Sequence, residues 1–427
     1  MIEVGDLERF NSWWKTGGVS SALVKKYKRE LFYKIQKFVD LRFAIIIQGL
    51  RRTGKTTLVY QLIEELLKKG VGPKNILFFS FDEKVFKIED VLDGYQKFVL
   101  GASFEELRDK KERVYVFFDE VQKTGDWESK LKVYYDLYPN VKFFLTGSAS
   151  ISLRKRSVES LAGRVFSFTL EPLNFEEFLE LKGRDLQKIK ENPNLWEKDV
   201  LPLFYQYLKY GCFPELVEVK DEETARQYIL TVVDRVVYKD IPEEFNVKDV
   251  ALLKELIYIV AKKPGLILDY NRIAKDLGKS RQTISDYFGY LEFSLLIKMI
   301  YNYRGSPLAS ARKAKKAYLG TPNICFAFAS NVESLFPFML ENVVVMAVHA
   351  EFFYRNGYEV DVVLEEGDDI IAIEVKKGGE ELGRLKRFTL EFSTRVKKSL
   401  LVSMEGEESG AVPAWKFLLF KESYLKV

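Results

Sequence analysis

Short apolar runs alternate with amphipathic stretches through the first part of the chain. Four runs have the length of buried strands rather than buried helices: 43–48, 75–81, 113–118 and 141–145. The stretches between them carry apolar residues at helical spacing, and strands that alternate with helices are typical of a parallel sheet. The pattern predicts an α/β domain that ends near residue 172.

The pattern changes after this domain. Residues 173–245 have helical periodicity, and three short helical segments follow at 252–261, 271–278 and 279–287. The last two are separated by Gly-Lys-Ser, which is typical of a helix-turn-helix. Its second helix would present Arg281, Gln282 and Ser285 to a DNA groove. The alternative, that these helices only pack against neighbouring domains, remains open.

Two alternating strands near the C-terminus are joined by a turn at 365–369. A hairpin centred on this turn places Asp361 opposite Glu374 and Glu359 opposite Lys376. Facing carboxylates repel one another unless a cation lies between them, and Mg²⁺ prefers oxygen ligands. The register therefore predicts a divalent cation at Asp361 and Glu374.

A glycine-rich loop follows the first predicted strand directly. Its glycines allow backbone N–H groups to point at phosphates, and a helix begins immediately afterwards. Lys55 is spaced to reach the β- and γ-phosphates of ATP, and the Thr56 hydroxyl is spaced to hold Mg²⁺. The residues predicted to bind ATP are Gly49, Arg52, Thr53, Gly54, Lys55, Thr56 and Thr57.

The third predicted strand ends in two acids. Asp119 is expected to hold Mg²⁺, and Glu120 is expected to polarise the attacking water as a general base. After the fourth strand, Thr146 and Ser148 are candidates for the polar residue near the γ-phosphate, or they simply form a turn.

Composition sets limits on the class of protein. The 427 residues are 47% hydrophobic, which suits about three domains with separate cores. Two cysteines cannot build a disulfide framework, and neither a signal peptide nor an apolar span of 18 residues is found, so a cytoplasmic protein without a membrane partner is expected. The 30% of charged residues fits a thermophile. The net charge of +4 does not itself indicate nucleic-acid binding.

One local run is strongly basic. Between Tyr303 and Tyr318 lie five basic residues without an acid, namely Arg304, Arg312, Lys313, Lys315 and Lys316. Such a run suits a phosphate backbone, and a solvated loop is the equally open alternative.

These motifs resemble archaeal and bacterial ATPases of the AAA+ type. The resemblance covers nearly the whole chain and rests on residues 28–31, 49–57, 119–122, 145–148, 161–164 and 170–175. It implies an ATP-hydrolysing core, a helical lid and a winged helix. It also implies that Arg164 senses the γ-phosphate, either in its own subunit or in a neighbouring one; a helix-end ion pair is the alternative. Arg51 and Arg52 are further candidates for this role.

The C-terminal hairpin resembles PD-(D/E)XK nucleases. This resemblance implies that Asp361 and Glu374 bind Mg²⁺, that Lys376 activates water, and that Glu341 adds an acid from a preceding helix. The sequence departs from the family pattern because Val360, and no proline, precedes the first acid. An active nuclease and an inactive interaction module both remain open.

Together these patterns predict a multidomain α/β protein. The expected domains are a P-loop core at 1–172, a helical lid at 173–245, a winged helix at 246–320 and a mixed α/β nuclease-like domain at 321–427. An ATPase that acts on DNA or is regulated by it is the first functional hypothesis, with a homo-oligomer or a partner protein as further partners. The second is a nucleotide-dependent switch that controls a protein interaction.

Overall fold

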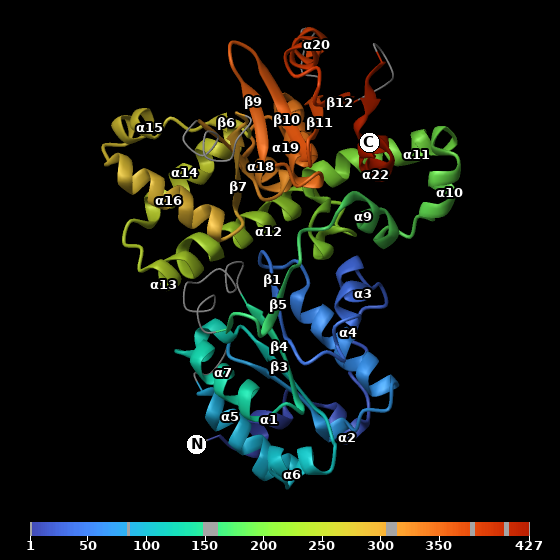
Figure 1. Cartoon of the computed structure of the whole chain (residues 1–427), viewed down its shortest axis with the longest axis vertical. Helices are drawn as coiled ribbons and strands as arrows, with labels where there is room; N and C mark the ends of the chain where they lie inside the picture. Colours follow the sequence, from blue (N-terminus) through green and yellow to red (C-terminus); the bar gives the residue numbers. More distant parts are fainter. Residues whose placement is uncertain are drawn as a thin grey trace. The chain divides into compact units, whose positions relative to one another are not determined.

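The computed structural model describes residues 2–82, 86–147, 161–304, 314–375, 381–404 and 410–426, except for the side chain of residue 381. The chain divides into two compact units, Met1–Glu171 and Pro172–Val427 (Figure 1). The predicted divisions of the second unit near residues 245 and 320 remain predictions.

A parallel five-stranded sheet forms the centre of the first unit, in the order β2-β3-β4-β1-β5. Its strands are β1 (Ala44–Gln48), β2 (Ile76–Ser80), β3 (Val114–Asp119), β4 (Val141–Gly147) and β5 (Val165–Thr169). The first four confirm the predicted strands to within two residues at each end. The sheet confirms the α/β fold class with a P-loop-type core.

Helices cover both faces of this sheet (Figure 1). Because alternate residues of a strand point to opposite faces, Ile45 and Ile47 pack on one side and Ile46 on the other. The first side is covered by α2 (Trp13–Thr16), α3 (Glu30–Gln36) and α4 (Lys55–Lys68). The second is covered by α1 (Val4–Glu8), α5 (Ile88–Tyr95), α6 (Phe104–Asp109) and α7 (Trp127–Leu137).

The second unit begins with helices. They are α9 (Phe175–Leu181), α10 (Leu186–Glu191), α11 (Pro193–Gln206), α12 (Glu222–Arg235) and α13 (Ile241–Phe245). The next segment contains α14 (Val250–Lys262), β6 (Leu266–Ile267), α15 (Tyr270–Asp276), α16 (Arg281–Phe293), β7 (Ile297–Asn302) and β8 (Lys315–Leu319). The three helices expected between 252 and 287 are therefore confirmed as helices.

An eight-stranded mixed sheet joins this segment to the C-terminal region, in the order β13-β12-β11-β10-β9-β7-β8-β6. The remaining elements are α18 (Pro322–Phe328), α19 (Phe336–Ala347), β9 (Phe352–Arg355), β10 (Glu359–Glu366), β11 (Asp369–Val375), α20 (Glu381–Glu391), β12 (Val396–Ser403), β13 (Val412–Pro413), α21 (Ala414–Leu419) and α22 (Lys421–Leu425). In the β10–β11 hairpin Val362 pairs with Ile373, which confirms the predicted register.

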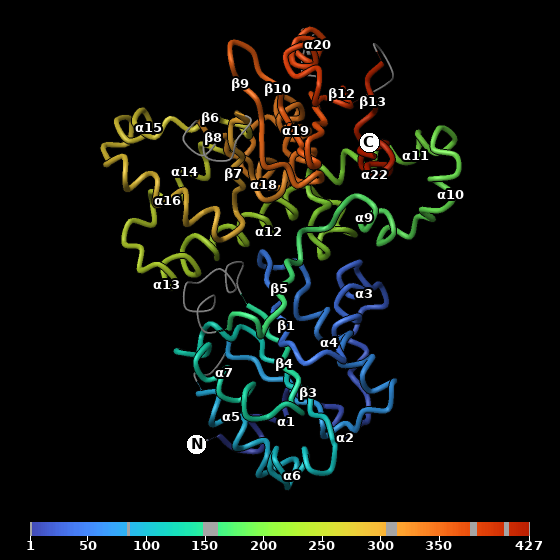
Figure 2. Tube along the Cα trace, in the orientation of Figure 1, coloured from blue at the N-terminus to red at the C-terminus, as the bar shows by residue number. Residues whose placement is uncertain are grey.

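The end of the chain returns to the first helices of its own unit. Helix α21 contacts α9 and α11, and Lys416 Nζ donates to Asn194 Oδ1 at 2.8 Å (Figure 2). Residues 172–427 therefore form one compact body from segments far apart in the sequence. Within the ranges that the structure describes, no helix has both the length and the apolar character needed to cross a membrane.

Candidate nucleotide site and carboxylate cluster

The glycine-rich loop lies between β1 and α4. A Cβ atom at Gly49 would come within 2.3 Å of the Leu170 carbonyl oxygen, so only glycine fits beside that backbone. Gly54 has φ +99°, a conformation that side chains disfavour, and nothing lies within 4 Å of where its Cβ would be. These two positions explain why the loop needs its glycines.

Lys55 is buried although it carries a charge. Its Nζ donates to the carbonyl oxygens of Gly49 at 3.0 Å and Leu50 at 3.1 Å, which holds the ammonium inside the loop. Thr53 Oγ1 also donates to the Leu50 carbonyl, at 2.9 Å, and Thr56 is exposed at the start of α4. Lys55 and Thr56 are therefore the first two residues of a 14-residue helix, whose N-terminus favours an anion.

Asp119 is the last residue of β3, which is separated from β1 and its glycine-rich loop by β4. Thr146 Oγ1 donates to one of its carboxylate oxygens, and Ser80 Oγ donates to the other at 3.3 Å. Burial and the neighbouring Glu120 raise the pKa of Asp119, while these hydrogen bonds and the charge of Lys55 act in the opposite direction. Thr146 thus contacts the acid, its place near the γ-phosphate stays a prediction, and Ser148 lies outside the described residues.

Glu120 adopts a left-handed backbone conformation with φ 54°. Its Oε2 accepts from Gln122 Nε2 at 2.6 Å, and its backbone N–H donates to Thr146 Oγ1 at 3.4 Å. The residue is 9% exposed and therefore buried. Neither Gln122 nor Ser80 was singled out as a site residue from sequence, since their roles depend on contacts across the sheet.

The residues of this edge fit MgATP. The donors that could face phosphates are backbone N–H groups and an ammonium, and the oxygens that could face Mg²⁺ come from Thr56 and Asp119. Parallel strands end at one edge of the sheet, which is why residues from β1, β3 and β4 meet there.

Arg164 lies at the end of the sheet where the strands begin, opposite the end that carries the glycine-rich loop. Ala44 N–H, at the start of β1, donates to the Arg164 carbonyl, and the loop begins only after Gln48, about 13 Å further along the strand. The guanidinium pairs with Asp136 at 2.9 and 3.1 Å. The structure therefore contradicts the expectation that Arg164 senses the γ-phosphate within its own subunit.

In the second unit, three carboxylates surround one buried lysine. Lys316 Nζ lies 3.0 Å from Glu341 Oε1, 2.7 Å from Glu359 Oε1 and 3.3 Å from Asp361 Oδ1. Tyr318 OH also donates to Glu341 Oε1, at 2.6 Å. Burial alone would lower the pKa of Lys316, but the phenol of Tyr318 and the carboxylates raise it above its ordinary range. These contacts therefore favour the charged form of Lys316.

Asp361 and Glu374 meet as the hairpin register predicts. Asp361 N–H donates to Glu374 Oε2 at 3.0 Å, and Val375 N–H donates to Asp361 Oδ2 at 3.0 Å. Burial, followed by the charge of Asp361, raises the pKa of Glu374 from 4.5 to about 9. Arg384 Nη1 approaches Glu374 Oε1 at 3.4 Å and opposes this shift.

This cluster bears on two predictions, namely the basic run between Tyr303 and Tyr318 and the divalent cation at Asp361 and Glu374. The basic run was predicted either to follow a phosphate backbone or to form a solvated loop, but its member Lys316 is buried among acids, and Arg304 donates to the Arg355 carbonyl at 2.7 Å. Arg312, Lys313 and Lys376 lie outside the described residues. Among the residues that are described, no group of three or more His, Cys, Asp or Glu side chains is arranged to hold a metal ion.

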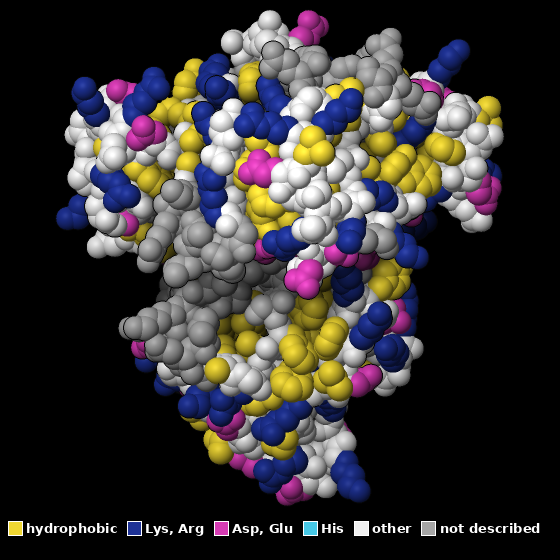
Figure 3. All heavy atoms as spheres, turned by 45° about the horizontal axis from the view of Figure 1, so that its top comes forward, with side chains coloured by type: hydrophobic (Ala, Val, Ile, Leu, Met, Phe, Trp, Pro, Cys, Tyr) yellow, Lys and Arg dark blue, Asp and Glu magenta, His cyan; other side chains and the backbone are white. Residues whose placement is uncertain are grey.

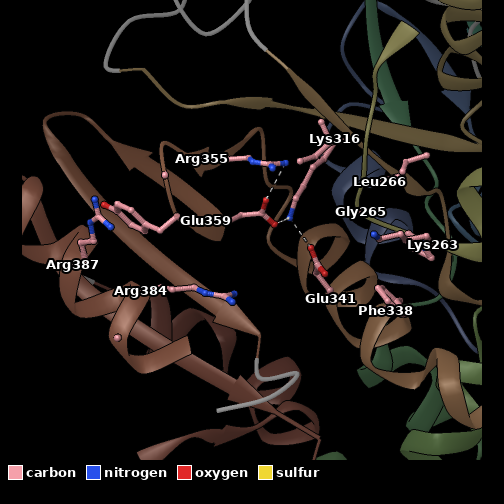
Figure 4. Close-up of a pocket in the computed structure, with 15 residues that line it drawn as sticks. Lys263, Gly265, Leu266, Lys316, Phe338, Glu341, Arg355, Glu359, Arg384 and Arg387 are labelled. Carbon is pink, nitrogen blue, oxygen red and sulfur yellow. Dashed lines mark hydrogen bonds and ion pairs between the residues drawn. The ribbon is translucent and has the colours of Figure 1, made fainter. Parts of the chain in front are cut away.

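A cavity of about 900 Å³ opens above the cluster. Figure 4 shows Arg384 and Arg387 of α20 on one side of it and Lys263 on the other, with Lys316, Glu341 and Glu359 between them. On the visible face of this unit in Figure 3, Lys and Arg side chains surround a small acidic area.

Two parts of the chain match known domain families. Residues 42–179 match the model described as an AAA domain, and residues 201–331 match a domain of unknown function. The first match and the loop geometry support a nucleotide-binding AAA+ P-loop ATPase.

Two similar proteins match most of this chain, and both are named as uncharacterised proteins. An uncharacterised protein of Haemophilus influenzae is 27% identical over 386 residues, which cover 84% of this chain and 88% of that one. An uncharacterised protein of Methanocaldococcus jannaschii is 26% identical over 347 residues, which cover 77% and 74%.

Solved structures with some likeness include Cdc6p from Pyrobaculum aerophilum and the Orc1 protein of Aeropyrum pernix in complex with DNA. They are 11% and 14% identical to this chain, and in each case 76% of this chain and 98% of the other are covered. Both TM-scores are 0.32, too low to carry a conclusion about function.

Proposed function

We propose that this protein is a Mg²⁺-dependent ATPase whose nucleotide state governs the engagement of DNA by residues 172–427. The observation that carries the ATPase part is the meeting of Lys55, Thr56 and the Asp119–Thr146 pair at one edge of a parallel sheet, within a matched AAA domain. Coordinated Mg²⁺ would neutralise phosphate charge there.

The residues divide the work of hydrolysis. Lys55 binds the β- and γ-phosphates, while Thr56 and Asp119 hold the cation. Glu120 takes the proton from the attacking water, and the hydrogen bond from Gln122 orients its carboxylate. Gly49, Arg52, Thr53, Gly54 and Thr57 complete the proposed phosphate loop.

The DNA part rests on the segment from α14 to β8. Its order of helices and strands supports a winged helix, in which α16 would enter a groove. Arg281 and Gln282 are exposed at the start of α16, and Ser285 is partly exposed one turn later. An exposed arginine at a helix N-terminus suits contact with phosphates or base edges.

A second candidate function is a nucleotide-dependent switch for a protein interaction. The Lys316 ammonium among the carboxylates favours it over a Mg²⁺-dependent nuclease, because the place between the acids already holds a cation. The nuclease assignment of Glu341, Asp361, Glu374 and Lys376 remains a proposal that DNA cleavage assays with Mg²⁺ and Mn²⁺ would test.

The deciding experiment measures ATP hydrolysis with Mg²⁺ in the presence and absence of duplex, forked and single-stranded DNA. We expect hydrolysis that EDTA abolishes and that at least one DNA form changes severalfold. The Lys55→Ala variant serves as the control for contaminating activity. Hydrolysis that no DNA form alters would favour the protein switch, and absence of hydrolysis in every condition would contradict the ATPase proposal.

A further inference from the structure

The cavity of the second unit has a basic rim and an acidic floor. Five cationic side chains line it, namely Lys263, Lys316, Arg355, Arg384 and Arg387. The acids that line it are Glu341 and Glu359. Lys263, Arg355 and Arg387 are exposed, and the Arg384 side chain is 39% exposed, so four cations are accessible at the rim.

The floor would repel an anion if it were not neutralised. Glu341 and Glu359 line the cavity, Asp361 shares their lysine, and a carboxylate near the opening disfavours a phosphate. The Lys316 side chain is only 2% exposed, so its ammonium serves the carboxylates rather than the solvent. It offsets one of the three negative charges of Glu341, Glu359 and Asp361, and the four cations of the rim outnumber the two that remain.

Lys316 also occupies the position that a divalent cation would need. Mg²⁺ requires about six oxygen ligands at about 2.0–2.1 Å, drawn inward around one centre. Here the centre shared by Glu341, Glu359 and Asp361 is an ammonium that donates at hydrogen-bonding distances of 2.7–3.3 Å. The residues present therefore do not fit a bound metal ion.

The rim suggests a ligand with several phosphates in a row. Its cations come from three segments: the residue after α14, the end of β9 and helix α20. In Figure 4 Lys263 and Arg387 lie on opposite sides of the opening. A single phosphate cannot engage both sides, whereas successive phosphates of a strand can.

We propose that this cavity binds the phosphodiester backbone of a nucleic acid without a divalent cation, with Lys316 as the built-in counter-charge of the acidic floor. The inference rests on the proposed function and deepens it, because it adds to α16 a further surface of the second unit that contacts DNA. It also implies binding without cleavage at this site, since no metal ion activates water there.

The first test concerns the counter-charge and needs neither ATP nor DNA. Melting temperatures are measured with EDTA and with Mn²⁺ for wild type, Lys316→Met and Lys315→Met, the last being a matched charge change on the same strand. We expect the melting temperatures of wild type and Lys315→Met to be the same with Mn²⁺ as with EDTA. We expect Lys316→Met to melt several degrees lower, and Mn²⁺ to restore part of that loss by binding the carboxylates that have lost their ammonium.

Two outcomes would overturn the counter-charge assignment. One is a rise in the melting temperature of wild type with Mn²⁺ equal to that of Lys316→Met. The other is a folded Lys316→Met variant that Mn²⁺ does not stabilise. If Lys316→Met does not fold, wild type and Lys316→Arg decide the question. Both keep the positive charge, so the melting temperature of each must be the same in EDTA as in Mn²⁺.

The second test concerns the ligand. Fluorescence anisotropy with labelled duplex and single-stranded DNA is measured in EDTA and in Mg²⁺, for wild type, Arg387→Gln and Lys386→Gln. Lys386 is the neighbouring exposed cation of α20 and does not line this cavity. We expect equal binding in EDTA and Mg²⁺, a severalfold loss in Arg387→Gln alone, and a salt slope smaller by about 1 in that variant.

Loss of DNA binding in EDTA would overturn the proposal, as would equal effects of Arg387→Gln and Lys386→Gln. Displacement of DNA by tripolyphosphate at equal phosphate concentration would also overturn the assignment to a strand and point to a free polyphosphate. All these measurements remain informative if ATP hydrolysis is absent, so their failure is distinguishable from failure of the proposed ATPase.

Discussion

Lys55 shows how a single side chain depends on its loop. Its ammonium lies on the carbonyl oxygens of Gly49 and Leu50, within reach of any phosphate held by the loop N–H groups. Lys55→Ala should therefore reduce ATP affinity at least tenfold, measured by calorimetry on the folded variant. Lys68→Ala, an exposed charge change on the same helix, should bind ATP normally. Unchanged affinity in Lys55→Ala would refute the phosphate assignment.

Glu120 has a different role from Lys55, so its replacement should have a different effect. Glu120→Gln keeps the shape of the side chain and removes its basicity. ATP should still bind, while turnover falls by about a hundredfold or more. Single-turnover hydrolysis measures this, and Glu112→Gln, just before the same strand, is the control. Normal turnover would remove Glu120 from the mechanism.

Arg164 tests whether the protein works as an oligomer. Since it cannot reach the loop of its own subunit, a role in hydrolysis requires a neighbouring subunit. In that case Arg164→Ala lowers turnover by about a thousandfold at constant ATP affinity, and mixing it with Lys55→Ala restores part of the activity. Asp136→Asn removes only the ion-pair partner and should keep turnover. Equal, near-normal turnover of both variants would show that the pair is structural.

At the scale of elements, the β10–β11 hairpin should make stability depend on pH. Asp361 faces Glu374 from the paired strand, with Arg384 from α20 and Lys316 from β8 nearby. Because the pKa of Glu374 is raised to about 9, the folded state keeps a proton that the unfolded state loses near pH 4.5. The free energy of unfolding therefore falls as pH rises between these values.

Glu374→Gln cannot ionise and should not follow this fall. The stability of the variant relative to wild type should increase from pH 5 to pH 9, by about 1.4 kcal/mol per pH unit at most. Urea unfolding at several pH values measures the difference. Glu366→Gln, at the exposed end of the same hairpin, should track wild type. Parallel curves for wild type and Glu374→Gln would mean that Glu374 is ionised in the folded protein across this range.

Elements built from local pattern were predictable from sequence. Strands β1 to β4 are continuous apolar runs, and the hairpin register followed from counting residues about its turn. Strand β5 was not predicted, because its residues are only partly buried at the edge of the sheet and do not form a continuous apolar run. Lys316 was misjudged for a related reason. Its acids lie 25 to 45 residues away in sequence, and only the pairing of β7 with β9 brings them together.

At the scale of the whole molecule, the division into two compact units has a thermodynamic consequence. Each unit has its own sheet and core, so each can respond to its own ligand. A ligand stabilises only the folded body that binds it, by about 2.7 kcal/mol at a concentration of 100 times Kd. Calorimetry should therefore show two unfolding transitions, of which MgATP raises one.

Variants assign the two transitions. In Lys55→Ala the shift with MgATP should disappear, while Lys316→Met should lower the other transition and leave the MgATP shift intact, because the two residues belong to different units. Communication between the units would appear as a DNA-dependent change in the size of the MgATP shift, since coupling between sites is reciprocal. A single transition that both variants lower equally would mean that the units unfold together, and nucleotide and DNA would then act on one cooperative body.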